Sequence, residues 1–90
     1  MPKHKTMQFV DDVMDISGEL EEAERKYPTF PVDVIHAAAI VGEEAGELLR
    51  AALRFTYEAG TVVDLRNEAL HTATMAVRFL MNIETLKGRR

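Results

Sequence analysis

The amino-acid sequence predicts an all-α protein: an antiparallel bundle of about three helices that is completed by oligomerisation. Apolar residues recur every three or four positions in three successive segments, which is the spacing of a helix with one packed face. No segment alternates apolar and polar residues over the length of a strand, so no β-sheet is expected. The chain has 90 residues and no cysteine, and we expect a single domain over residues 1–90, with flexible tails at 1–6 and 87–90.

The first helix is predicted over residues 9–27. Its apolar positions are separated by steps of four, three, four, three and four, which places them on one helical face: Phe9, Val13, Ile16, Leu20, Ala23 and Tyr27. The segment "KYPTFP" ends this helix, because Pro28 and Pro31 are poorly tolerated inside one.

The second helix is predicted to begin near residues 31–33 and to run to about Glu58. A proline suits the first turn of a helix, and the carboxylate of Asp33 suits its positive end. The inward positions are expected to be Val34, Ala37, Val41, Glu44, Ala45, Leu48, Ala52 and Phe55. Gly60, in the segment "EAGT", is expected to end the helix in the left-handed conformation.

The third helix is predicted to begin after Thr61, which together with Asp64 has the form of a capping box. The inward positions are expected to be Leu65, Ala69, Thr72, Ala76, Phe79, Leu80 and Ile83. Because the link between the second and third helices is short, they are expected to be antiparallel neighbours. Several apolar faces on so small a chain indicate that partner subunits cover part of them.

The composition narrows the classes of function. The formal net charge is −4 and the pI about 5.3, which argue against a general nucleic-acid binder because such proteins carry a basic surface. No apolar run approaches the ~20 residues of a membrane span, and the N-terminus lacks the apolar segment of a secretory signal. We therefore expect no nucleic-acid or membrane partner and a cytoplasmic location.

Two pairs of polar residues are predicted to face inward from the second and third helices. Glu44 and Glu47 are three residues apart on one helix, and Glu68 and His71 have the same spacing on the next. Inward carboxylates are costly unless a positive charge compensates them. A divalent cation would do so, and Mg²⁺ prefers hard oxygen ligands and phosphate. The pattern favours a site for Mg²⁺, or for Mn²⁺ in its place, although spacing alone is also typical of a solvated acidic face.

The motif "EEAGE", followed after 20 residues by "EALH", resembles the MazG-type all-α nucleoside triphosphate pyrophosphohydrolases, whose pattern is E-E-x-x-E, a spacer and E-x-x-D. The resemblance covers about residues 34–83. It implies hydrolysis of a (d)NTP to (d)NMP and pyrophosphate, nucleotide-pool cleaning, and subunits associated as dimers or dimers of dimers. It assigns Glu44, Glu47 and Glu68 as catalytic residues and metal ligands.

His71 stands where the resembling family has aspartate. It is either a fourth metal ligand or a neighbour of the site that contacts substrate or a metal-bound water. An imidazole nitrogen is a softer ligand than Mg²⁺ prefers, so this position bears on both the metal complement and turnover.

The residues assigned to substrate binding are Arg78, Glu43 and Lys26. Arg78 follows His71 by seven residues, which places it on nearly the same helical face two turns on. Glu43 is the first acid of the "EEAGE" motif, and Arg66 is a further basic candidate. Aromatic residues available as an apolar wall against the base are Tyr27, Phe30 and Phe55.

Two other classes of function are open at this stage. One is a catalytically degenerate relative that binds a nucleotide or metal without turnover, as a consequence of His71. The other is a helical protein-interaction module whose acidic residues are only surface charges. Pyrophosphate release that depends on metal separates the enzyme from both.

Overall fold

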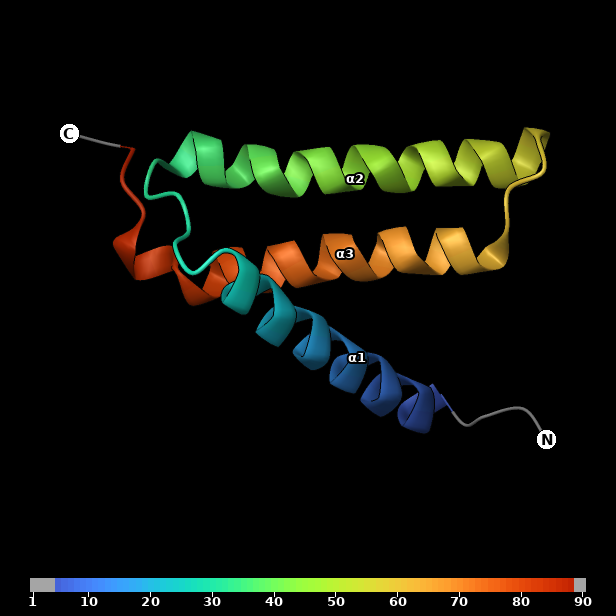
Figure 1. The fold of residues 1–90 in the computed structure, drawn as a ribbon, viewed down its shortest axis with the longest axis horizontal. Coiled ribbons are helices and arrows are strands. Elements are labelled where there is room, and N and C mark those ends of the chain that lie inside the picture. The colour runs from blue at the N-terminus through green and yellow to red at the C-terminus, as the bar shows by residue number, and fades with distance from the viewer. Residues whose placement is uncertain (1–4, 89–90) are drawn as a thin grey trace.

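The computed structural model describes residues 5–88, which form three long helices (Figure 1). These are α1 (Lys5–Lys26), α2 (Val34–Tyr57) and α3 (Val62–Met81), and a short 3₁₀ helix, η1 (Ile83–Thr85), follows them. Residues 5–88 contain no strand, so the predicted all-α class is confirmed. Lys5 and Thr6, expected in a tail, belong to α1, whereas the expected tail residues 1–4 and 89–90 lie outside the described residues.

The helices α2 and α3 form an antiparallel hairpin and lie side by side along their length (Figure 1). Each begins at the capping residue that the sequence indicates. The side chain of Asp33 accepts a hydrogen bond from the backbone N–H of His36 at 2.8 Å. The hydroxyl of Thr61 accepts one from the backbone N–H of Asp64 at 3.1 Å. Each bond satisfies one of the free N–H groups of a first helical turn.

Gly60 lies in the tight link of the hairpin, but the expected left-handed conformation is wrong, since no glycine within residues 5–88 has a positive φ. Its small size is required instead. A Cβ at this position would lie 2.7 Å from the backbone nitrogen of Phe55 and 2.8 Å from the carbonyl carbon of Arg54. The N–H of Gly60 also donates to the carbonyl oxygen of Arg54 at 3.2 Å, so the chain folds closely back over the last turn of α2.

The first helix packs on α3 and makes no comparable contact with α2 in the described part of the chain. Figure 1 shows α1 leaving the hairpin at an angle. Arg66 on α3 connects the two helices, because its guanidinium donates to Asp12 at 2.9 Å and to Asp15 at 2.7 Å. The contact between α1 and α3 is therefore partly ionic and lies on the surface.

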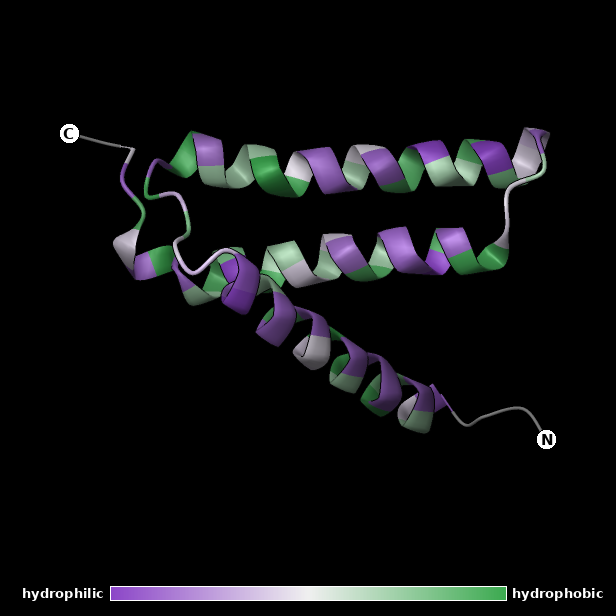
Figure 2. Cartoon of the chain, viewed as in Figure 1, coloured by the Kyte–Doolittle hydropathy of each residue, from purple (hydrophilic) through white to green (hydrophobic). Residues whose placement is uncertain are grey.

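The predicted apolar face of α1 is only partly buried. Ile16, Leu20 and Ala23 are half-buried as expected. Phe9, by contrast, is 67% exposed and Val13 43%. The face of α1 that meets α3 is centred on polar residues, and the apolar stripe is turned away from it by part of a helical turn. Hydrophobic residues therefore remain at the surface in the N-terminal half of α1 (Figure 2).

The fully buried part of the described chain is small: Ala37 and Ala51 on α2, and Thr74 and Arg78 on α3. Several positions predicted to face inward are exposed instead: Ala45, Phe55, Ala69, Leu80 and Ile83. Among the described helices α2 packs on α3 alone, so its buried face is narrower than its apolar pattern, and α3 contacts α1 and α2 over only part of its circumference. On α3 the most buried positions lie nearly opposite Ala69 and Leu80.

A short backbone contact at the end of the described chain closes the structure. The N–H of Lys87 donates to the carbonyl of Val32 at 2.6 Å, and the N–H of Val34 donates to the carbonyl of Lys87 at 2.9 Å. Lys87, expected in a tail, thus holds the link of residues 27–33 between α1 and α2. None of the helices in residues 5–88 combines the length and apolar character needed to cross a membrane.

Candidate functional site

Three side chains that can bind a metal meet between α2 and α3. They are Glu44, Glu68 and His71, whose potential ligand atoms all lie within 4.8 Å of one another. His71 Nδ1 lies 3.2 Å from Glu68 Oε1 and 3.9 Å from Glu44 Oε2. The two glutamate side chains are 31% and 26% exposed and His71 is 46% exposed, so the cluster is half-buried and open to solvent.

The fold explains why these residues meet. Glu68 and His71 are three residues apart on α3, so they project from the same side of that helix. Glu44 lies on the face of α2 that carries Ala37 and Ala51, which is the face packed on α3. The short turn at Gly60 sets the register of the two helices, and the length of the glutamate side chains absorbs the remaining axial offset.

The structure does not bring Glu47 or Glu43 into this cluster. The carboxylate of Glu47 lies 3.0 Å from the guanidinium of Arg50, one turn further along α2. Glu43 is exposed. Two of the three carboxylates assigned as metal ligands therefore meet His71, while the third is paired with a cation of its own helix.

The donor atoms of the cluster fit a divalent cation. Two carboxylates supply negative charge and oxygen ligands, and the imidazole of His71 supplies a nitrogen ligand. The oxygen-only set that Mg²⁺ prefers is not present, because His71 supplies a nitrogen and Glu47 is turned toward Arg50. The nitrogen ligand suits transition-metal dications better than it suits Mg²⁺.

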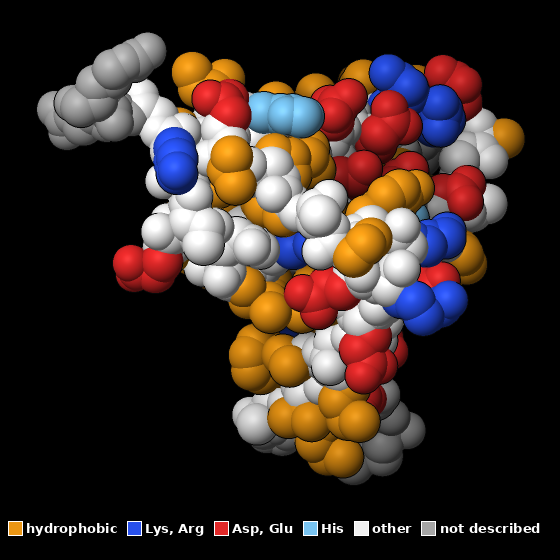
Figure 3. All heavy atoms as spheres, turned by 60° about the vertical axis from the view of Figure 1, so that its left-hand side comes forward, with side chains coloured by type: hydrophobic (Ala, Val, Ile, Leu, Met, Phe, Trp, Pro, Cys, Tyr) orange, Lys and Arg blue, Asp and Glu red, His pale blue; other side chains and the backbone are white. Residues whose placement is uncertain are grey.

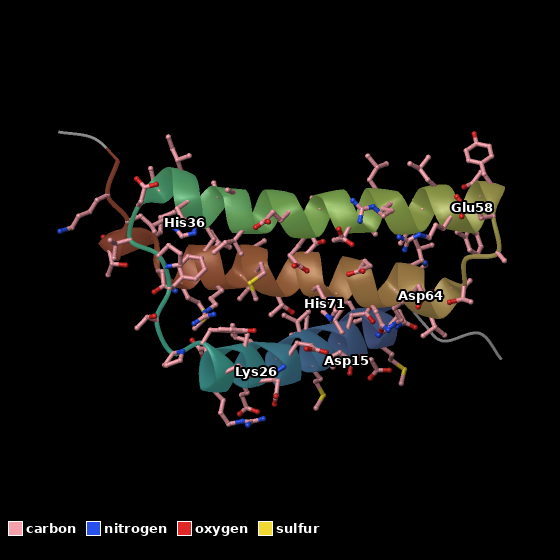
Figure 4. All side chains as sticks on the ribbon, turned by 45° about the horizontal axis from the view of Figure 1, so that its top comes forward. Asp15, Lys26, His36, Glu58, Asp64 and His71 are labelled. Carbon is pink, nitrogen blue, oxygen red and sulfur yellow. The ribbon has the colours of Figure 1, made fainter. Side chains whose placement is uncertain are left out.

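A pocket of about 530 Å³ opens beside the cluster, between the C-terminal half of α1, the link and the α2–α3 hairpin. Both Glu44 and His71 line it. Its other lining residues are Glu19, Glu22, Ala23, Lys26, Tyr27, Thr29, Phe30, Pro31, Ile40, Thr74, Met75 and Arg78. Figure 4 shows His71 on α3 and Lys26 at the end of α1. The pocket thus joins the candidate metal cluster to a chamber lined by apolar residues, by the basic Lys26 and Arg78, and by the acidic Glu19 and Glu22.

Arg78 is the buried cation of this pocket, with 4% of its surface exposed. Its guanidinium donates to the backbone carbonyl of Tyr27, and its central carbon lies 5.3 Å from the centre of the Phe30 ring. Its Nε atom has no hydrogen-bond partner among the described residues. A buried guanidinium with an unused donor is costly unless an anion or acceptor compensates it, so Arg78 is a candidate for binding an anionic ligand.

The remaining candidates are distributed around the pocket. Lys26 and Tyr27 both line the pocket. Lys26 is exposed, and 65% of the surface of Tyr27 is exposed. Phe55 lies outside the pocket, near the other end of the hairpin. Hydrogen bonds to Asp15 and then to Asp12 raise the pKa of Arg66, so this residue serves to hold α1 on α3.

Residues that the sequence did not single out supply much of the pocket wall. Thr29 and Pro31 come from the link, Ile40 from α2, and Thr74 and Met75 from α3. The proline-rich segment "KYPTFP" signalled a link but not its position over α3. That position depends on the Arg78–Tyr27 bond and on the backbone bonds of Lys87, which are contacts between residues far apart in the sequence.

Comparison of this chain with models of known protein families, with curated proteins and with solved structures gave no match. The assignment of a function therefore depends on the geometry of the site and on the resemblance of its two motifs.

Proposed function

We propose that this protein is a metal-dependent nucleoside triphosphate pyrophosphohydrolase, which hydrolyses a (d)NTP to a (d)NMP and pyrophosphate and so cleans the nucleotide pool. One observation carries the proposal. Glu44 and His71, which belong to the candidate metal cluster, line the same pocket as Arg78, a buried cation with an unused donor. A nucleoside triphosphate needs positive charge at two places along its phosphate chain and an apolar surface for its base. The metal cluster, Arg78 and the apolar side chains of this pocket offer these.

The residues divide into three tasks. Glu44, Glu68 and His71 would hold the divalent cation, with Mg²⁺ or Mn²⁺ as the expected ion, which supplies neutralisation of the phosphate charge. Arg78 and Lys26 offer positive charge to the phosphates. Arg78 lies seven residues beyond His71 on α3, or about 10 Å along the helix axis, which leaves room for several phosphates between them.

The apolar side chains of the link and of α3 surround the other part of the pocket. Phe30 lies over Arg78 and, with Ile40 and Met75, offers an apolar surface on which a base can stack. Because the buried groups exclude water from the Arg78 guanidinium, its attraction for a phosphate is stronger than it would be at an exposed site.

We further propose that the chain works as a homodimer or homotetramer. Its accessible surface of 7010 Å² exceeds the ~5,300 Å² of a compact monomer of 10.1 kDa by well over ~1,000 Å². A stable interface needs about 800 Å² from each partner. The excess includes exposed apolar residues of α1, namely Met7, Phe9, Val10 and Met14. Figure 3 shows hydrophobic side chains gathered at one end of the molecule.

Turnover is tested with a panel of NTPs and dNTPs in Mg²⁺ or Mn²⁺, with phosphate detected before and after addition of inorganic pyrophosphatase. The proposal requires a signal that depends on both the metal and pyrophosphatase. Glu68→Gln and Glu44→Gln should abolish it, while Glu21→Gln, an exposed glutamate of α1 outside the pocket, should leave it unchanged. Phosphate released without pyrophosphatase, or no product from any nucleotide, would contradict the proposal.

One observation favours a second candidate, a nucleotide- or metal-binding protein without turnover. Glu47 is paired with Arg50 rather than with the cluster, so only two carboxylates are placed to support chemistry. Binding of a nucleotide in calorimetry, without product in the same panel, would favour this candidate over the enzyme.

A further inference from the structure

The cluster of Glu44, Glu68 and His71 has the spacing of ligands around one ion. Adjacent ligand atoms around an ion with bonds near 2.1 Å are about 3.0 Å apart in an octahedron and about 3.4 Å apart in a tetrahedron. His71 Nδ1 lies 3.2 Å from Glu68 Oε1 and 3.9 Å from Glu44 Oε2. Small side-chain rotations would bring all three atoms to these separations.

A hydrogen bond alone does not account for the cluster. The single proton on Nδ1 can serve one carboxylate at a time, so a hydrogen bond to Glu68 leaves Glu44, 3.9 Å from the same nitrogen, without one. The two carboxylates also lie within 4.8 Å of each other and repel. A dication would give Glu44 a partner and would offset the repulsion between the carboxylates, because it binds the lone pair of the imidazole and an oxygen of each carboxylate.

An independent feature, the buried guanidinium of Arg78, points to a bound anion in the pocket that Glu44 and His71 also line. Arg78 is 4% exposed, its Nε has no partner within residues 5–88, and it lines the same pocket as Glu44 and His71. An extended anionic ligand that reaches from a metal ion in the cluster to this guanidinium would compensate the charge of both. The cluster is therefore more than a group of surface acids.

The chemistry of the donors selects the ion. Mg²⁺ demands oxygen ligands in a near-ideal octahedron, whereas imidazole nitrogen binds first-row transition metals well. We infer that the Glu44–Glu68–His71 site prefers a transition-metal dication, of which Mn²⁺ and Co²⁺ are the probes, and that His71 is the residue that sets this preference over Mg²⁺. The inference concerns the site of the proposed function, but the metal preference does not depend on turnover.

The test is a calorimetric titration of the wild-type protein and of His71→Asp with Co²⁺, Mn²⁺ and Mg²⁺, with the visible absorption of bound Co²⁺ as a second readout. Because aspartate replaces nitrogen by oxygen, the ratio of Co²⁺ to Mg²⁺ affinity should fall by about tenfold or more in His71→Asp. The Co²⁺ absorption bands should shift as well. His71→Ala should weaken Co²⁺ more than Mg²⁺, and Glu68→Gln should weaken both.

An unchanged affinity ratio and an unchanged Co²⁺ spectrum in His71→Asp would overturn the inference, as would a wild-type protein that binds none of the three ions. Circular dichroism shows whether each variant keeps its helices, and His71→Ala serves if His71→Asp does not fold. The two proposals fail differently. Selective Co²⁺ binding without pyrophosphate release refutes the enzyme only, and turnover with an affinity ratio insensitive to residue 71 refutes the metal preference only.

Discussion

The guanidinium of Arg78 lies under the ring of Phe30, with 5.3 Å between its central carbon and the centre of the ring. A cation of α3 is thus covered by an aromatic residue of the link between α1 and α2. The same guanidinium donates to the carbonyl of Tyr27, so this residue both holds the link and lines the pocket that the link covers. Arg78 therefore contributes to the stability of the link and, in the proposed function, to ligand binding.

Replacing Arg78 by methionine should affect both. Arg78→Met removes the hydrogen bond that holds the Tyr27 carbonyl, so the free energy of unfolding should fall by about 1.5–3 kcal/mol in the absence of ligand. Affinity for a triphosphate should fall by about 1.5–3 kcal/mol, because a hydrogen bond to a charged group is lost. Denaturant unfolding and calorimetry with a non-hydrolysable nucleotide measure the two quantities. Unaltered nucleotide affinity in a folded variant would remove Arg78 from the binding site.

Removal of metal should lower the stability of the protein. An ion that binds only the native state contributes about 2.7 kcal/mol at a hundredfold excess over its Kd. For a domain of this size that corresponds to a Tm about 11–22 °C higher in millimolar Mn²⁺ than in excess EDTA. Glu68→Gln should lose this difference, while Glu21→Gln should keep it. Equal melting temperatures for the wild-type protein in both conditions would show that the cluster binds no metal.

The protein in solution should have the mass of two or four chains of 10.1 kDa each. Phe9 is 67% exposed and Val13 is 43% exposed on α1, so the double variant Phe9→Asp/Val13→Asp should reduce the mass toward that of one chain. Multi-angle light scattering at micromolar concentration measures both. A single-chain mass for the wild-type protein contradicts the proposed assembly, and an unchanged oligomer in the double variant places the interface elsewhere.

Arg66 should control how firmly α1 is held. Its bonds to Asp12 and Asp15 are exposed, so Arg66→Gln should change global stability little. Hydrogen exchange should nevertheless become faster in α1 and stay unchanged in the α2–α3 hairpin, and raised salt should have the same effect on the wild-type protein.

The pH dependence of this contact follows from the pKa of Arg66. Because the hydrogen bonds to Asp15 and Asp12 raise the pKa of the guanidinium, the contribution of its charge is fully present below the unfolded-state pKa and is lost as the pH rises through the folded-state pKa in strongly alkaline solution. Salt is therefore the appropriate variable to test this contact. Exchange that becomes faster throughout the hairpin would show that Arg66 supports the whole fold.

Gly60→Ala should disturb the register of the hairpin. The added Cβ would lie 2.7 Å from the backbone nitrogen of Phe55, so the link must move, at a cost of about 1–3 kcal/mol. Because the register brings Glu44 to His71, metal affinity should fall as well. Gly46→Ala is the matched control, since a Cβ there meets nothing within 4 Å, and it should stabilise α2 by about 0.5–1 kcal/mol. Equal effects of the two substitutions would show that close approach at Gly60 is unimportant.

The sequence predicts where the helices of this fold begin and end better than it predicts which face of each helix is buried. Proline, the capping residues Asp33 and Thr61, and the apolar periodicity are local signals, and the helices they predict are present. The rotation of α1 is not a local property, because it depends on the pairing of Arg66 with Asp12 and Asp15 across more than 50 positions. For this reason Phe9 and Val13 were expected to face inward and do not.

The candidate site shows the same division. The spacing of Glu68 and His71, and the short link, are sufficient to expect them near Glu44, and the structure brings these three together. The i, i+3 rule that places Glu47 beside Glu44 applies equally to Glu47 and Arg50, so spacing could not decide which neighbour Glu47 contacts. The Phe30–Arg78 stacking and the pocket wall arise from a link whose path no local signal encodes.

The backbone bonds of Lys87 to Val32 and Val34 have a consequence for the order in which the protein forms during synthesis. Lys87 follows Asp33 by 54 residues, so the link leaves the ribosome long before the residue that holds it. At ~5–20 residues per second, that interval is roughly 3–11 seconds. The nascent chain can therefore form its helices while the pocket still lacks a fixed wall, and a nascent chain that has not yet reached Lys87 should not bind the proposed nucleotide.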